Sequence, residues 1–256
     1  MGNNVYGIKD SANLICNKKS EPNKVYLYSD YGTITENQWQ NDSVYAMSKD
    51  TRAIRWDHNK NSTLKVTFEI FDLKILSLMT GSDFVVGKTN FRKREQLTVG
   101  ADNKVTLGST PVAGSLILYN LDTDNLTNLE EITVGDPATD PNTYSITGNE
   151  ITLNTTSHPV GSTIAAFYFT LTGETSKVMT IKSDVFGANC EIFADTKIRD
   201  IDGEDKYVQM HYLNCKPKHN FTITMSASDI TKLVVEFDVL KDSKSTDMAT
   251  YTIIDD

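Results

Sequence analysis

A two-residue alternation of apolar and polar side chains recurs along this chain and limits what it can fold into. Its clearest instance runs from Leu64 to Ile70, where apolar residues alternate with Lys65, Thr67 and Glu69. This is the period of a strand with one face in a core and the other in water. Similar runs, rich in β-branched and aromatic residues, occur at Val25–Tyr28, Val44–Met47, Ser115–Tyr119, Ile164–Leu171, Val178–Ile181, Glu191–Ile198, Tyr207–Leu213, Phe221–Met225 and Leu233–Leu240.

One short segment, about residues 72–80, has the pattern of a helix instead. Asp72 can cap its start, Leu73, Leu76 and Met79 share one face, and Gly81 can end it. Many short strands with one helix predict a mainly β fold, a β-sandwich or barrel core with one short α-helix.

Charged side chains are distributed unevenly along the 256 residues. Residues 1–99 carry a net charge of +3, residues 100–175 carry −8, and residues 176–256 carry −4, which gives −9 for the chain. Such a shift is typical of a module inserted into a host domain. We therefore expect a core built from 1–99 and 176–256, with 100–175 inserted as a small Ig-like β-sandwich. Clustering on one acidic face of a single domain is the alternative.

Bulk composition disfavours several classes of protein. No apolar run approaches the roughly 18 to 20 residues of a membrane span, and the first residues lack the apolar core of a secretion signal. The acidic net charge disfavours tight nucleic-acid binding. Cys16, Cys190 and Cys215 are too few for a disulfide scaffold. We expect a protein made in a cytoplasm, without contact to a membrane.

The sequence has no motif that carries catalytic chemistry. It lacks a nucleophile elbow, a phosphate-binding loop and a dinucleotide fingerprint, and its four histidines are scattered. We expect no catalytic residue and no cofactor. One segment begins like an acidic calcium-binding loop, with Asp122, Asp124 and Asn125 followed by Glu130. Thr127 stands where such a loop requires glycine. We expect a solvated loop and no metal site.

Basic residues cluster once, at Lys88 and at Arg92, Lys93 and Arg94. Phe91 beside them suggests a nucleic-acid patch, but such a cluster is more typical of a solvated strand or a subunit contact.

The order of several segments resembles the tail tube (major tail) proteins of bacteriophages that infect Gram-positive bacteria. The matching segments cover most of residues 52–240 and are Ala53–Asp57, Leu64–Gly81, Arg94–Val99, Thr110–Tyr119, Tyr144–Gly148, Ile181–Asp184, Phe186, Asp195–Asp200, Gly203, Gln209, Lys216–Lys218, Phe221 and Phe237–Leu240. Two local departures stand out. Gly187 follows Phe186 without the usual proline, and polar Asn214 and Cys215 precede Lys216 where apolar residues are usual.

The resemblance implies a structural virion protein that catalyses nothing. Such proteins form hexameric rings that stack into a hollow tube, and strands from each subunit join in one barrel around the lumen through which genomic DNA passes. The expected partners are copies of the chain itself, the tape measure and tail terminator proteins, and a sheath protein where the tail contracts. The expected location is the virion tail, after assembly in the host cytoplasm.

Two other classes fit parts of the sequence. Another virion or surface protein, such as a capsid decoration or an adhesin, fits the Ig-like pattern of the middle segment. A β-rich enzyme acting on carbohydrate would need a pair of carboxylates in a cleft, and no spacing singles out such a pair.

The stretch from Ser29 to Asn61 predicts a long loop, because it has few sustained apolar alternations and many polar residues. An ordinary hairpin through Val44–Met47 is the alternative. The resemblance implies that the loop contacts the next ring, and the candidate residues are Glu36, Asn37, Gln38, Trp39, Gln40 and Asn41.

The stretch from Cys190 to Cys215 predicts a hairpin that turns at Asp202-Gly203, a favoured two-residue turn. This turn places Cys190 opposite Cys215, and we expect both to be free thiols. It also predicts that each face of the hairpin carries both apolar and polar side chains. A longer loop over Asp200–Asp205 would shift the register. The resemblance implies a place in the inter-subunit barrel, with candidate pairs Ile192 and Leu213, Ala194 and His211, Thr196 and Gln209, and Ile198 and Tyr207.

Overall fold

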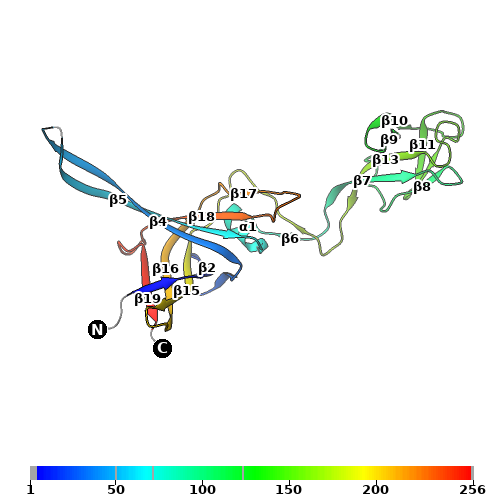
Figure 1. The fold of residues 1–256 in the computed structure, drawn as a ribbon. Coiled ribbons are helices and arrows are strands. Elements are labelled where there is room, and N and C mark those ends of the chain that lie inside the picture. Colours follow the sequence, from blue (N-terminus) through cyan, green and yellow to red (C-terminus); the bar gives the residue numbers. More distant parts are fainter. Residues whose placement is uncertain (1–4, 50, 71, 123, 255–256) are drawn as a thin grey trace. The chain divides into compact units, whose positions relative to one another are not determined.

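The chain divides into two compact units. The computed structural model describes residues 5–49, 51–70, 72–122 and 124–254. Unit 1 contains residues 1–84 and 179–256, and unit 2 contains Val85–Val178. The mainly β prediction is confirmed, with one short helix and a nearly closed, barrel-like sheet (Figure 1).

Unit 1 is built on a ten-stranded sheet. Seven strands follow the order β3-β2-β15-β16-β18-β5-β4, while β1 pairs with β15, β17 with β18 and β19 with β16. Every partner pairing that the structure gives within this sheet is antiparallel. The strands are β1 (Tyr6–Ile8), β2 (Asn13–Lys18), β3 (Val25–Ser29), β4 (Gly32–Ser48), β5 (Thr51–Phe68), β15 (Cys190–Asp200), β16 (Asp205–Pro217), β17 (Thr222–Ile223), β18 (Leu233–Val239) and β19 (Ala249–Ile254).

The apolar residues of the alternating pattern form the core of unit 1. Leu64, Val66 and Phe68 of β5 are at most 1% exposed, and they meet the alternating residues of β18 and β15. Between them, Lys65 remains partly accessible, whereas Thr67 is only 8% exposed. The same alternation that predicts the strands therefore also decides which face is buried.

The helix α1 (Leu73–Thr80) begins and ends where the sequence predicts. The Asp72 side chain accepts a hydrogen bond from the Lys74 N–H at 2.8 Å, and Gly81 ends the helix with a left-handed φ of 73°. Its buried apolar residues are Ile75, Leu78 and Met79, whereas Leu73 is exposed. Of the three residues expected to share one face, Met79 is buried and Leu76 packs against the core, whereas Leu73 lies outside the buried face that Ile75 and Leu78 complete.

A close backbone contact beside the end of this helix explains why residue 187 is glycine. A Cβ on Gly187 would overlap the Leu78 carbonyl oxygen and lie 2.7 Å from Pro217 Cγ. The Gly187 carbonyl accepts a hydrogen bond from Lys216 Nζ at 2.6 Å. Glycine is needed here because backbone packs directly against backbone.

Unit 2 has a core of its own and a seven-stranded sheet in the order β7-β13-β9-β10-β11-β12-β8. A separate two-stranded sheet is formed by β6 and β14. The strands of unit 2 are β6 (Val85–Val86), β7 (Asn90–Thr98), β8 (Lys104–Thr106), β9 (Ile117–Leu121), β10 (Asn128–Val134), β11 (Thr143–Thr147), β12 (Glu150–Leu153), β13 (Thr163–Leu171) and β14 (Lys177–Val178). Leu118, Ile151, Ile164 and Tyr168 are fully buried in its core.

The strand β7 pairs with β13 along its whole length, from Thr98 opposite Thr163 to Asn90 opposite Leu171. It therefore belongs to unit 2, which begins before the expected boundary at residue 100. The Ig-like character of the inserted segment stays a prediction.

His158 is the most deeply buried of the histidines. It is 1% exposed, and neither ring nitrogen has a hydrogen-bond partner within the described part of the chain. Its backbone is fixed on both sides, because its N–H donates to Asn154 and its carbonyl accepts from Asn103 Nδ2 at 2.7 Å. Burial lowers the pKa of the imidazole, since the charged form loses its hydration.

We expect unit 2 to lose stability in acid through His158. The unfolded chain binds a proton below about pH 6.5, whereas the folded imidazole resists it, so the free energy of unfolding falls as pH drops below that value. One such group changes it by at most about 1.4 kcal/mol per pH unit. Thermal unfolding between pH 7.5 and 5.5 measures the slope, and His158→Phe should flatten it. Equal slopes for both proteins would contradict this assignment.

Candidate assembly surfaces

The tip of the β15–β16 hairpin carries one further strand on each side. Near the turn, β1 pairs with β15 from Ile8 opposite Ile198 to Tyr6 opposite Asp200. On the other side, β19 pairs with β16 from Ala249 opposite Tyr212 to Ile254 opposite Tyr207. The result is a four-stranded segment in the order β1-β15-β16-β19, which we call the tip sheet.

Both outer strands of the tip sheet have a free edge. Within the described residues, β1 pairs with β15 alone and β19 with β16 alone. Tyr251 and Ile253 of β19 remain 50% and 46% exposed. An unpaired strand edge is a template for pairing with another chain. Sequence reasoning missed both edges, although Thr250–Ile254 is a run of β-branched and aromatic residues.

The expected turn at the hairpin tip is wrong by one residue. The Gly203 N–H donates to the Asp200 carbonyl and the Asp200 N–H to the Glu204 carbonyl, so three residues form the loop. Gly203 closes it with a φ of 93°, the left-handed conformation that such loops need at their last position. The carboxylate of Asp200 also accepts hydrogen bonds from the N–H groups of Asp202 and Glu204.

The longer loop shifts the pairing of the hairpin. Ile198 lies opposite Lys206, Thr196 opposite Val208, Ala194 opposite Met210 and Ile192 opposite Tyr212, so these four expected pairs are wrong. The expected pair Cys190 and Cys215 is confirmed, because a bulge between Cys190 and Ile192 restores the register. Leu213 lies at this bulge, where its N–H donates to the Met248 carbonyl.

The shift separates apolar from polar residues and corrects the expected mixed faces. A one-residue slip exchanges the two faces of a strand. The observed register places Ile192, Ala194, Thr196 and Ile198, all at most 6% exposed, on the same face as Val208 and Tyr212. The candidates Tyr207, Gln209 and His211 lie on the opposite face, away from the partners expected for them.

On that opposite face, the side chains of each cross-strand pair contact one another. The rings of Phe193 and His211 stack with 4.2 Å between centroids. Gln209 Nε2 donates to Asp195 at 2.9 Å. In the next pair, Lys197 Nζ lies 5.5 Å from the centroid of the Tyr207 ring. In the last pair, Arg199 Nη2 donates a hydrogen bond to the Asp205 carboxylate at 2.8 Å. Hydrogen bonding by Arg199 holds the pKa of Asp205 below its ordinary value. This polar face is preorganised without burial.

A two-stranded arm extends from the β4 edge of the sheet. The strands β4 and β5 have 17 and 18 residues, but β5 pairs with β18 only from Ser62 onward. Residues 40–49 and 51–61 therefore form a ribbon outside the sheet, which we call the arm (Figure 1). The expected loop is wrong, because the candidate segment from Glu36 to Asn41 is part of a strand. It pairs with β5 everywhere except at the bulge.

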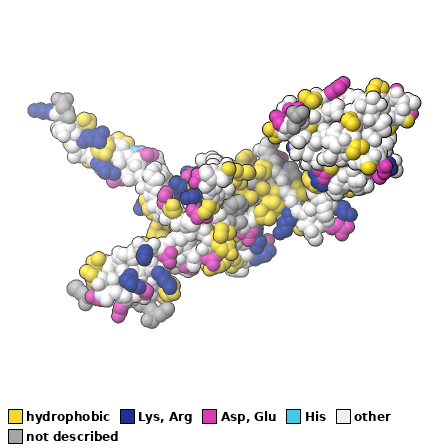
Figure 2. Space-filling view, turned by 45° about the vertical axis from the view of Figure 1, so that its right-hand side comes forward, with side chains coloured by type: hydrophobic (Ala, Val, Ile, Leu, Met, Phe, Trp, Pro, Cys, Tyr) yellow, Lys and Arg dark blue, Asp and Glu magenta, His cyan; other side chains and the backbone are white. Residues whose placement is uncertain are grey.

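The two faces of the arm differ in chemistry. On one face, Asp57 accepts hydrogen bonds from Asn41, Ser43 and Arg55 at 2.6 to 2.8 Å, and these bonds lower its pKa. The other face carries two apolar cross-strand pairs, Val44 with Trp56 and Ala46 with Ile54. Val44, Ile54 and Trp56 are 53 to 56% exposed. Figure 2 shows hydrophobic and basic side chains interspersed along the arm.

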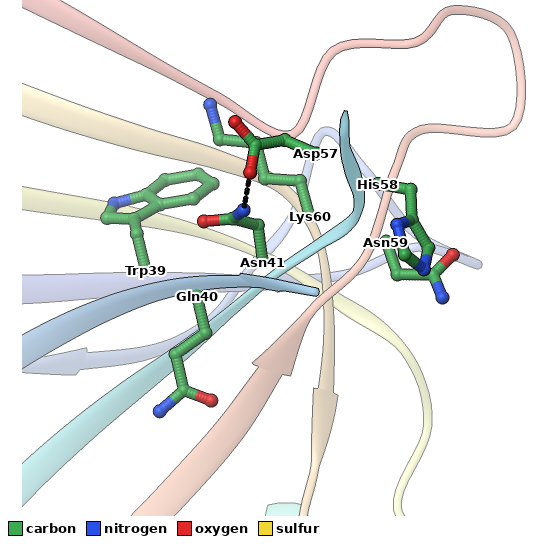
Figure 3. A pocket seen from close by; sticks show the side chains of 7 residues that line it. All are labelled: Trp39, Gln40, Asn41, Asp57, His58, Asn59 and Lys60. Atoms are coloured by element: carbon green, nitrogen blue, oxygen red, sulfur yellow. Dashed lines mark hydrogen bonds between the residues drawn. The ribbon is translucent and has the colours of Figure 1, made fainter. Parts of the chain in front are cut away.

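The base of the arm contacts the tip sheet. Tyr251 of β19 donates its hydroxyl hydrogen to Asn37 at 2.7 Å, and Trp39 Nε1 lies 3.4 Å from the same hydroxyl. Beyond this contact, Trp39 and Lys60 line a hollow of about 510 Å³ where the ribbon is bulged (Figure 3). In that view Trp39 and Gln40 point to opposite sides of β4, as successive strand residues do.

The described residues offer little for chemistry. They contain no group of three or more histidine, cysteine, aspartate or glutamate residues placed to hold a metal ion. In the acidic loop, Asp122 and Asp124 accept hydrogen bonds from the Leu126 N–H and shape a turn. None of the helices described has the length and apolarity needed to cross a membrane.

A comparison with family models gives one match over nearly the whole chain. The model described as the YomU/Tube protein family matches residues 6–254, which include the tip sheet, the arm and unit 2. No curated protein matches the sequence.

We expect the three cysteines to be unreactive in the folded protein. Cys16, Cys190 and Cys215 are free and at most 1% exposed, and burial raises the pKa of Cys16 to about 12. A thiol reagent needs access and the thiolate, and both are denied here. Counting with a thiol reagent should find no reactive group in buffer and three in denaturant. Three in buffer would contradict the burial, and one in denaturant would reveal a disulfide.

Proposed function

We propose, since the chain belongs to the YomU/Tube protein family, that it is the structural subunit of a bacteriophage tail tube. In this proposal copies of the chain form hexameric rings that stack into a hollow tube for the ejection of DNA. The subunit catalyses nothing and needs no cofactor. It is part of the virion tail of a phage of Gram-positive bacteria, assembled in the host cytoplasm with the tape measure and terminator proteins, and with a sheath protein where the tail contracts.

The observation that carries the proposal is the tip sheet with its two free edges. The β19 edge of one copy pairs with the β1 edge of the next, and repetition of this step around a ring leaves no unpaired edge. Closure of a sheet into a barrel is how β-proteins remove edges that would otherwise aggregate. Each ring thus receives four strands from every copy.

The two faces of the tip sheet determine its orientation in such a barrel. The apolar face with Ile192 and Val208 belongs to the subunit core, so the polar face from Phe193 to Arg199 faces the lumen. Its charges are mixed, and Arg199 is already paired with Asp205. A wall without unpaired clusters of basic residues lets DNA phosphates pass without binding tightly.

The arm supplies the contact between rings. A two-stranded ribbon in water is at best marginally stable by itself, so the arm requires a surface to cover it. Its polar face is already satisfied by the bonds around Asp57, whereas the face of Val44, Ile54 and Trp56 has no cover within the described subunit. We therefore place the apolar face against a subunit of the neighbouring ring.

Cysteine pairs across the β1 and β19 edges test ring closure. Gly7 pairs with Arg199, so it lies on the polar face with Thr250, Thr252 and Ile254 of β19. In double variants Gly7→Cys with a cysteine at 250, 252 or 254, we expect at least one to give a ladder of disulfide-linked oligomers that ends at the hexamer. Each single variant should give at most a dimer. Tubes in the electron microscope with no ladder from any pair would contradict the edge assignment.

Ile54→Asp tests the arm separately. A carboxylate buried without a partner costs several kcal/mol, so stacking should weaken at least about 100-fold while single rings still form. Arg52→Ser is the matched control, because Arg52 lies over the Tyr45 ring rather than among the apolar pairs. Negative-stain microscopy and sedimentation velocity distinguish tubes from rings. Normal tubes from Ile54→Asp would refute the role of the apolar face.

A further inference from the structure

Unit 2 presents arginine and aromatic side chains together on the outer face of its sheet. The register of β13 with β7 places Phe167 opposite Arg94 and Phe169 opposite Arg92, while β9 places Tyr119 opposite Ala165 on the same face. The core side chains Ile164, Ala166 and Tyr168 alternate with these and lie on the inner face. We call Arg92, Arg94, Tyr119, Phe167 and Phe169 the arginine patch.

The geometry of the patch is ordered. The guanidinium carbons of Arg92 and Arg94 lie 5.8 and 5.7 Å from the centroid of the Phe167 ring, within the range of a cation–π contact. The Tyr119 ring meets the same Phe167 ring edge-on, with 6.1 Å between centroids. Both arginines are exposed, and Phe169 is 42% exposed. Aromatic residues and arginine are the types enriched in protein interfaces.

The two arginines differ from most other basic residues of unit 2 in their charge environment. Lys88 pairs with Glu174, Lys93 with Glu95 and Lys104 with Glu150, at 2.5 to 3.1 Å. Within the described residues, no carboxylate forms an ion pair with Arg92 or Arg94. The patch therefore offers two positive charges on a partly apolar floor to an acidic partner.

The same unit carries a surface of the opposite kind. Unit 2 contains ten acidic and six basic residues. Glu130 and Glu131 of β10 are exposed and make no ion pair in the described part of unit 2, and Leu126 and Leu129 beside them are 77% and 60% exposed. We call residues 126–131 the acidic segment. It combines carboxylates with apolar groups, as the arginine patch combines guanidinium groups with rings.

We infer that the arginine patch of one copy binds the acidic segment of a second copy. The inference rests on the proposed function, because a ring brings identical units side by side. Glu131 lies opposite Tyr119, so the acidic segment adjoins the arginine patch on the same face of the sheet. Two surfaces made of different residues can meet head to tail, which is the arrangement that closes into rings. The second copy is favoured over another anionic partner because the chain itself supplies the complementary surface. Unit 2 thereby provides a second contact between neighbouring subunits, in addition to the barrel.

Charge reversal and exchange test the contact in the full-length chain. We expect Arg92→Glu with Arg94→Glu to raise the concentration for half-maximal assembly at least tenfold in low salt. Glu130→Arg with Glu131→Arg should do the same, because like charges then meet. A mixture of the two double variants should assemble like the wild type, since alternating copies again present opposite charges. Lys88→Glu with Lys104→Glu is the charge-matched control and should assemble normally.

The outcomes separate this inference from the proposed function. Rescue by mixing supports contact between copies. Rescue only when all four substitutions share one chain would show contact within one copy and overturn the inference. Defects that neither mixing nor combination repairs would point to a different acidic partner, such as an anionic polymer, and also overturn it. Rings that form equally well from every variant would refute the inference alone, whereas a wild type that forms no rings would refute the proposed function.

Discussion

The register of the β15–β16 hairpin is the constraint on which the rest of unit 1 depends. The three-residue turn that ends at Gly203 sets Ile198 opposite Lys206, and through this pairing it decides which side of both strands faces the core. A turn shorter by one residue would bring Lys197 onto the side of Val208. A charge would then lie in the core, at a cost of several kcal/mol. The turn and the apolar pattern therefore specify one register together.

The hairpin also joins the parts of unit 1 that the proposed assembly uses. Near its tip it pairs with β1 and β19, and near its base with β2 and β18. Through Tyr251 of β19 it is connected to Asn37 and Trp39 at the base of the arm. In the proposed tube, strand pairing around the ring and docking along the axis thus involve adjacent residues of one sheet. An error in one register would displace both contacts.

The two units use charge in different ways. On the tip sheet, opposite charges meet on neighbouring strands, as Arg199 and Asp205 do, so little net charge remains for a ligand. In unit 2, Arg92 and Arg94 are held over a ring, while Glu130 and Glu131 stand on another strand. In the proposed contact between copies, these charges are available to a second copy because they are not paired within one.

Much of the local structure of this protein follows from its sequence alone. Alternation identified most of the long strands, the cap at Asp72 and the stop at Gly81 located the helix, and the order of segments suggested the family. These properties depend on neighbours along the chain, for which periodicity and capping are sufficient signals. The tertiary structure alone decided the turn before Glu204, the partners of β1 and β19, and the extended arm in place of a loop. Strand partners and strand ends are chosen by hydrogen bonds between residues distant in sequence. No local pattern encodes that choice, because the same alternating strand can pair with any other.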